Sequence, residues 1–113
     1  MKLITKAIEA KVPATLAQNG KGDAAIIYAK FFHPRSNLTW YMTEYDPVGR
    51  IAWGLVQGFE EEWGYFSIDE METISSPGVE RDLYFGDGHT IGEVRRRTTS
   101  YMEGETMRWK VRR

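Results

Sequence analysis

The chain has 113 residues, 42% of them apolar and 13% aromatic, which suits one folded domain with a single core. The absence of cysteine excludes disulfides, thiolate metal sites and a cysteine nucleophile. No apolar run approaches the roughly 18 residues of a membrane span, and charged residues interrupt the N-terminal segment, so we expect a soluble cytoplasmic protein. The net charge of −1 is unevenly spread: residues 1–89 sum to −5 and residues 90–113 to +4.

The N-terminal part predicts a short helix, a loop and a first strand. Thr5 can cap a helix over residues 6–11, and Gly20 and Gly22 permit the positive φ angles of a polar loop. Residues 24–32 are almost continuously apolar, which is typical of a strand covered on both faces.

The aromatic middle of the chain predicts three more strands, over residues 38–45, 51–59 and 63–66. In the first of them, alternation places Tyr41 and Tyr45 on one face, away from the core. The glycines of the next one, Gly54 and Gly58, mark bulges or leave room for a packed helix. The residues predicted to fill the core are Trp40, Met42, Trp53, Leu55 and Phe59.

Two capping boxes predict helices in the C-terminal half. Ser67 and Glu70 open a helix over residues 68–74, which should present Ile68, Met71 and Ile74 to the core. A last short extended segment follows at residues 83–85. A weaker capping box at residues 90–93 opens a second helix that continues through residue 97.

These elements predict an α+β domain over residues 1–97. Its sheet is an antiparallel meander of three to four strands, with the short helices packed on one face. Residues 98–113 form a basic C-terminal tail outside this domain.

Four segments resemble one known family. They are MKLITKAIEAKVP, DAAIIYAKFFHPRSNLTWYMTEYD, GLVQGFEEEWGYFSIDEMETI and VERDLYF before TIGEV, with the motifs KFF-P-SN-TWY-TE-D, GYFS and ERDL-F. Over residues 1–94 the chain is similar to the phage and plasmid proteins catalogued as domain of unknown function 2958. The resemblance implies a small cytoplasmic accessory protein of a mobile element and supplies no catalytic residues. Some relatives carry a label as single-strand DNA nucleases, and this activity must be tested against the residues of the chain.

The residues themselves give little support to an enzyme. A metal-dependent nuclease needs carboxylates that converge on divalent ions, but Glu44 and Asp46 should lie at the opposite end of the meander from residues 60–62. His33 and His89 lie in turns without the spacing of metal ligands. We therefore expect no catalytic residue, no metal and no cofactor.

Two surfaces are candidates for binding. Tyr41 and Tyr45 would lie on the exposed face of the sheet, where bases of single-stranded nucleic acid can stack. The basic C-terminal segment offers cations and an aromatic that can contact phosphate or an acidic protein. Its candidate binding residues are Arg95, Arg96, Arg97, Arg108, Trp109, Lys110, Arg112 and Arg113.

The hypothesis that follows is a non-enzymatic accessory protein of a phage or plasmid. It would bind a host protein or nucleoprotein complex, as an antagonist of host defence. The alternative is a protein that binds single-stranded nucleic acid, and a metal-dependent nuclease is third.

Overall fold

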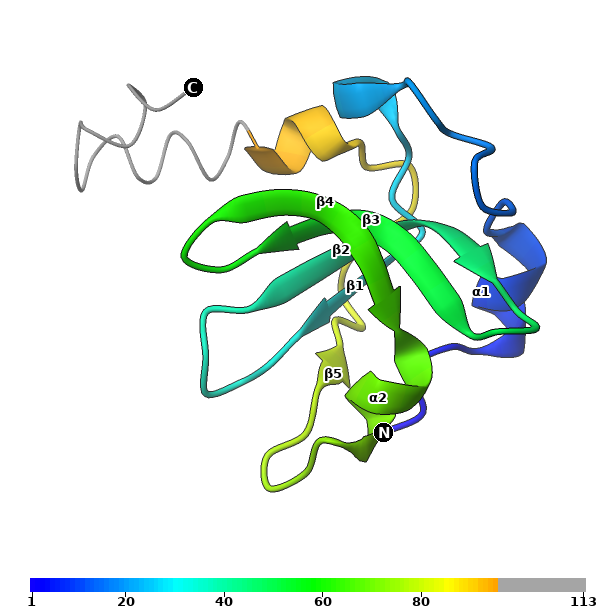
Figure 1. Cartoon of the computed structure of the whole chain (residues 1–113). Coiled ribbons are helices and arrows are strands. Elements are labelled where there is room, and N and C mark those ends of the chain that lie inside the picture. Colours follow the sequence, from blue (N-terminus) through cyan, green and yellow to red (C-terminus); the bar gives the residue numbers. More distant parts are fainter. Residues whose placement is uncertain (96–113) are drawn as a thin grey trace, which may run out of the picture.

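The computed structural model describes residues 1–95 of the chain. One antiparallel sheet forms its centre, with five strands in the order β4-β3-β2-β1-β5 (Figure 1). The strands are β1 (Ala29–Phe32), β2 (Thr39–Asp46), β3 (Ile51–Gln57), β4 (Glu61–Ser67) and β5 (Glu80–Arg81). The helices are α1 (Lys6–Lys11), the 3-10 turn η1 (Gly22–Ala24) and α2 (Ile68–Thr73), and residues 91–95 are also helical. None of the helices in residues 1–95 is long and apolar enough to cross a membrane.

The α+β class and the antiparallel meander are confirmed, but the predicted count of three to four strands is wrong. The fifth strand, β5, pairs with β1 through Phe31 and Arg81. It precedes the predicted extended segment at residues 83–85. A two-residue strand carries no alternating pattern of its own, so only its distant partner defines it.

The first strand is shorter than predicted, because its N-terminal half has a different partner. Ile27 N–H donates to the carbonyl of His89 over 2.8 Å, and Ile91 N–H donates to the carbonyl of Ala25 over 3.0 Å. Ladder pairing with β2 begins only at Ala29. The first part of this apolar run therefore bonds to the segment at residues 89–91, and the second part, from Ala29, pairs with β2.

Helices cover both faces of the sheet, so the prediction that they pack on one face is wrong. One core cluster joins Phe31 and Met42 to Ile68 and Met71 at α2. The cluster on the other face contains Ala25, Ile27, Tyr41, Leu55, Ile91 and Val94. Figure 1 shows α2 and the helical turn at residues 91–95 on opposite sides of the sheet.

A β-bulge in β2 changes which side chains share a face. The register with β3 shifts between Met42 and Glu44, so one extra residue stands in β2. Side-chain alternation is then offset by one position beyond the bulge. As a result, Tyr41 belongs to the cluster of Leu55 and Ile91, whereas Tyr45 belongs to the opposite cluster.

Most of the predicted core is buried, with two clear exceptions. Trp40, Met42 and Leu55 are buried as predicted, and Trp53 is half-buried. Phe59 is 86% exposed because β3 ends at Gln57 and the residue lies in the turn that follows. Ile74 is also exposed, because it is the C-cap of α2 rather than a residue of its inner face.

The predicted helix caps are confirmed. Thr5 Oγ1 accepts the N–H of Ile8 over 3.1 Å, and Ser67 Oγ accepts the N–H of Glu70 over 3.1 Å. At residues 90–93 the box is reciprocal: Thr90 Oγ1 accepts the N–H of Glu93, and Glu93 Oε1 accepts the N–H of Thr90.

Candidate functional site

Tyr41 and Tyr45 do not form an exposed binding face. Tyr41 is 6% exposed and Tyr45 is 2% exposed, and the bulge sends their rings to opposite sides of the sheet. The Tyr45 hydroxyl accepts a hydrogen bond from Nε of Arg50 over 3.4 Å. The prediction that these two rings share a solvent-exposed surface is therefore wrong.

Arg95 is occupied by the fold. Its Nη1 lies 2.8 Å from Oδ1 of Asp23, and its Nε lies 2.8 Å from Oε1 of Glu61. These two ion pairs join the helical turn at residues 91–95 to η1 and to β4. The other predicted binding residues lie outside the described residues: Arg96, Arg97, Arg108, Trp109, Lys110, Arg112 and Arg113.

The acidic residues considered for a nuclease hold loops in place. Glu44 is 2% exposed, and its carboxylate accepts the N–H groups of Leu16 over 2.6 Å and Gln18 over 2.9 Å. Asp46 accepts the N–H of Val48 in the turn between β2 and β3. Within residues 1–95 no group of three or more His, Asp or Glu side chains is placed to hold a metal ion.

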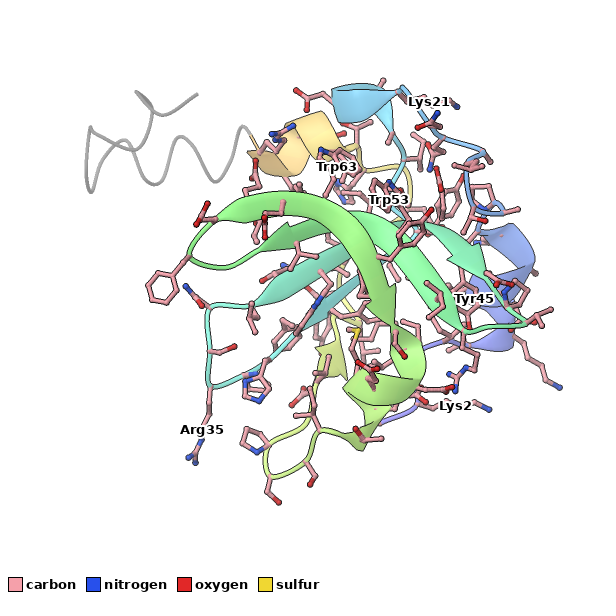
Figure 2. The ribbon with its side chains drawn as sticks, in the orientation of Figure 1. Lys2, Lys21, Arg35, Tyr45, Trp53 and Trp63 are labelled. Atoms are coloured by element: carbon pink, nitrogen blue, oxygen red, sulfur yellow. The ribbon has the colours of Figure 1, made fainter. Side chains whose placement is uncertain are left out.

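One group of aromatic side chains that reaches the surface comes from β3 and β4. Trp53 and Trp63 stack with ring centroids 6.2 Å apart, and Trp53 meets Tyr65 edge-on at 4.7 Å. Tyr65 is 60% exposed. Figure 2 shows Trp53 and Trp63 on the side of the sheet that faces the helical turn at residues 91–95, away from Tyr45. We call Trp53, Trp63 and Tyr65 the β4 aromatic patch.

The β4 aromatic patch lies on an edge of the sheet. Among the described strands, β4 pairs only with β3. A strand edge carries backbone N–H and C=O groups that can pair with another chain. The acidic run at residues 60–62 stands at the start of this edge, where charge discourages uncontrolled association.

A pocket of about 380 Å³ lies near the opposite edge of the sheet, and we call it the Lys30 pocket. Lys30 projects from β1 and Tyr41 from β2, and the remaining lining comes from the segment after β5 and from the helical turn. The full lining is Lys30, Tyr41, Asp82, Tyr84, Phe85, His89 and Val94.

An ion pair and a row of rings shape the Lys30 pocket. Nζ of Lys30 lies 3.3 Å from Oδ2 of Asp82, and it is 5.9 Å and 5.8 Å from the ring centroids of Tyr41 and Phe85. Both side chains of the ion pair are about a quarter exposed. An ammonium over aromatic faces is stabilised by their quadrupoles, so Lys30 has a fixed place in the wall.

His89 is also held in the pocket wall. Its Nδ1 lies 3.2 Å from Oε2 of Glu93, whose other carboxylate oxygen serves the capping box. The ring packs against Phe85 at a centroid distance of 4.6 Å. These contacts are consistent with the interpretation of His89 as a hydrogen-bonding turn residue. The sequence did not indicate that His89 lines a pocket.

Sequence reasoning missed the Lys30 pocket because its lining comes from segments about fifty residues apart. The available signal was that Lys30 and Tyr41 fall in the motif KFF-P-SN-TWY, and Asp82 and Phe85 in ERDL-F. Two segments that carry the family resemblance therefore meet at this pocket.

Comparison with known proteins identifies the family. No curated protein and no solved structure shows significant similarity to the chain. A family model described as "Protein of unknown function (DUF2958)" matches residues 3–101, which covers most of the sequence and all but the first two of the described residues. The chain therefore belongs to the DUF2958 family.

Proposed function

We propose that the protein is a non-enzymatic binding protein whose partner is another protein or a nucleoprotein complex. The observation that carries this proposal is the β4 aromatic patch, which places two tryptophans and a largely exposed tyrosine beside an edge strand. Tryptophan and tyrosine are the residues most often found at the energetic centres of protein interfaces. An edge strand adds main-chain groups to which an extended peptide can pair.

Charge favours a protein partner with a basic surface. Residues 1–95 carry nine Lys and Arg against fourteen Asp and Glu, a net charge of −5. Two exposed acidic residues, Glu60 and Glu62, stand at the beginning of β4, while Glu61 between them pairs with Arg95. A basic segment pairing with β4 would meet complementary charge, which raises association rates and disfavours acidic competitors.

The family resemblance extends this proposal to a biological setting. In that setting the protein is an accessory factor of a phage or plasmid, and its partner is a host protein or nucleoprotein complex. Antagonism of host defence is the role that such a partner would imply.

Binding of single-stranded nucleic acid is the second candidate. The observation in its favour is that Trp63 and Tyr65 share one face of β4, as base-stacking residues do in single-strand binders. The acidic character of residues 1–95 opposes it, since phosphate contacts dominate such binding. The candidate phosphate contacts are the arginines that follow Arg95 in the sequence.

The two candidates separate in one affinity experiment. The full chain is used to capture partners from a bacterial host lysate, with and without nuclease treatment, alongside Tyr65→Ala. Tyr84→Ala is the matched control, because Tyr84 is 97% exposed and lies near the opposite edge of the sheet. We expect a defined protein to be retained after nuclease treatment, to be lost with Tyr65→Ala and to remain with Tyr84→Ala.

Other outcomes count against the proposal. If the captured material disappears with nuclease, and a labelled single-stranded oligonucleotide binds with a steep salt dependence, the second candidate replaces the first. If Tyr65→Ala and Tyr84→Ala behave alike, the β4 aromatic patch is not the binding surface.

A further inference from the structure

We propose that the Lys30 pocket binds a neutral, planar ligand of the nucleobase class. This inference is independent of the proposed protein partner, because it rests on a different edge of the sheet and on different residues. Its basis is the combination of aromatic walls, a donor and an acceptor side by side, and a size suited to one base.

The walls of the pocket are aromatic and tilted. Tyr41 and Phe85 lie 6.1 Å apart with an interplanar angle of 51°, and Phe85 and His89 lie 4.6 Å apart at 43°. The ammonium of Lys30 lies over the rings of Tyr41 and Phe85, so this wall offers a planar ligand mainly the ring edges. A planar ligand can pack against this wall by edge-to-face contact, which is a favoured arrangement of aromatic rings.

The polar groups of the pocket select against simple ions. Lys30 presents ammonium N–H donors next to the carboxylate of Asp82, 3.3 Å away. A phosphate or carboxylate drawn to Lys30 would be repelled by Asp82, and an amine drawn to Asp82 would be repelled by Lys30. A neutral ligand whose edge carries an acceptor beside a donor satisfies both groups, and the edges of nucleobases have this pattern.

Tyr84 stands at the rim of the pocket and is 97% exposed. Its backbone is held at the rim, since its N–H donates to Oδ1 of Asp82 over 2.9 Å. One oxygen of the Asp82 carboxylate thus pairs with Lys30, and the other accepts the N–H of Tyr84 at the rim. A tyrosine ring at the mouth of a pocket has an apolar face that can stack on an entering base.

The size of the pocket limits the ligand. A volume of about 380 Å³ lies in the lower part of the range of small-molecule sites, roughly 300–1,000 Å³. We therefore expect one base or nucleoside at a time, either free or as part of a strand.

The test is a titration of the full chain, labelled with ¹⁵N, with each of the four common ribonucleosides, with inorganic phosphate and with a short single-stranded oligonucleotide. We expect at least one nucleoside to shift the amide signals of residues 82–89, and phosphate to leave them unchanged. Tyr84→Ala should weaken the binding of that nucleoside about tenfold, because stacking of the base on one ring is lost. Phe59→Ala, which removes another exposed aromatic ring outside the pocket, should leave the affinity unchanged. A second variant, Lys30→Met, should also weaken binding while the spectrum stays that of a folded protein.

Tighter binding of the oligonucleotide than of the nucleoside would identify a strand as the source of the base, and the reverse would identify a free nucleoside. The proposal is overturned if no nucleoside shifts these signals, if phosphate shifts them equally, or if Tyr84→Ala and Phe59→Ala give the same affinity. A protein partner captured through Tyr65 would be unaffected by any of these results.

Discussion

At the scale of single residues, Gly54 is a glycine of β3 with no room for a side chain. A Cβ atom placed there would lie 1.8 Å from the carbonyl oxygen of Tyr41, a backbone atom that cannot move aside alone. Gly54 pairs with Met42, directly beside the bulge of β2. The bulge and the glycine are thus one structural feature, because the distorted backbone of β2 occupies the space that a side chain would need.

We predict that Gly54→Ala destabilises the fold by about 3 kcal/mol or prevents folding, at the upper end of overpacking penalties. Gly64→Ala is the matched control. Gly64 pairs directly with Gly54 in β4, and a Cβ atom there would have no neighbour within 4 Å. It should be neutral or slightly stabilising, since alanine loses less backbone entropy than glycine. Urea denaturation of the two variants measures the difference, and equal stabilities would contradict the close approach.

The buried carboxylate of Glu44 stabilises the fold. Its two carboxylate oxygens accept the N–H groups of Leu16 and Gln18, which attach the loop after α1 to β2. In Glu44→Gln one oxygen becomes an amide NH₂ group, which cannot accept either bond. We predict a loss of about 1–3 kcal/mol in unfolding free energy, the usual penalty for a buried donor left without its acceptor. Glu60→Gln, an exposed control, should change little; comparable losses for both would refute the structural role.

The residue-scale features that sequence could predict are the local ones. The caps at Thr5 and Ser67 follow from residues three positions apart, and both are confirmed. The burial of Glu44 and the reversed face of Tyr45 could not be predicted, because both depend on the bulge in β2. A single extra residue in a strand leaves no mark in the alternating pattern until the partner strand is known.

At the scale of elements, the turn between β2 and β3 is joined to α2 and to the N-terminal segment by one ion-pair network. Arg50 donates through Nη1 and Nη2 to the two carboxylate oxygens of Glu72, at 3.1 Å and 3.2 Å, and Nη1 also bonds Asp69. Glu72 in turn accepts the N–H of Leu3 over 2.8 Å. Burial alone would raise the pKa of Glu72, but the bonds from Arg50 and from Leu3 N–H outweigh it and hold the pKa below its ordinary value of 4.5.

This network predicts a pH-dependent stability. Because the carboxyl pKa is lower in the folded state, the contribution of Glu72 is present above the ordinary pKa and is lost as pH falls through the lowered one. We predict that Glu72→Gln costs about 1–3 kcal/mol at neutral pH, as expected for charged hydrogen bonds. The difference from the unmodified chain should shrink below pH ~4. Urea melts across this pH range measure it, and a difference independent of pH would contradict the ionic origin.

The elements that the sequence predicted well are those whose own residues carry a pattern or a cap. Strands β2 and β3 alternate, and α1 and α2 carry their own caps, so their boundaries are close to the predicted ones. The missed β5 and the late start of β1 are set by pairing between residues 48 or more positions apart. For the same reason the sequence did not indicate the Lys30 pocket.

At the scale of the whole molecule, both faces of the sheet are covered by segments from the two ends of the described chain. Leu3 and Ile4 belong to the core on one face, and Ile91 and Val94 belong to the core on the other. The sheet is thus enclosed only when the chain has reached the helical turn at residues 91–95. The charge is uneven along the sequence: residues 1–95 carry a net charge of −5 and residues 96–113 a net charge of +4.

This arrangement predicts where the chain can be shortened. A chain that ends at Gly88 lacks Ile91 and Val94, and the burial of two such side chains is worth about 1.5–3 kcal/mol each. We predict that it loses at least about 3 kcal/mol or fails to fold. A chain that ends at Arg97 keeps every described core residue and should unfold at the same urea concentration as the full chain. The family match continues to residue 101. If ending at Arg97 costs stability and ending at Tyr101 does not, the domain extends to the end of that match, and the boundary expected at residue 97 is wrong.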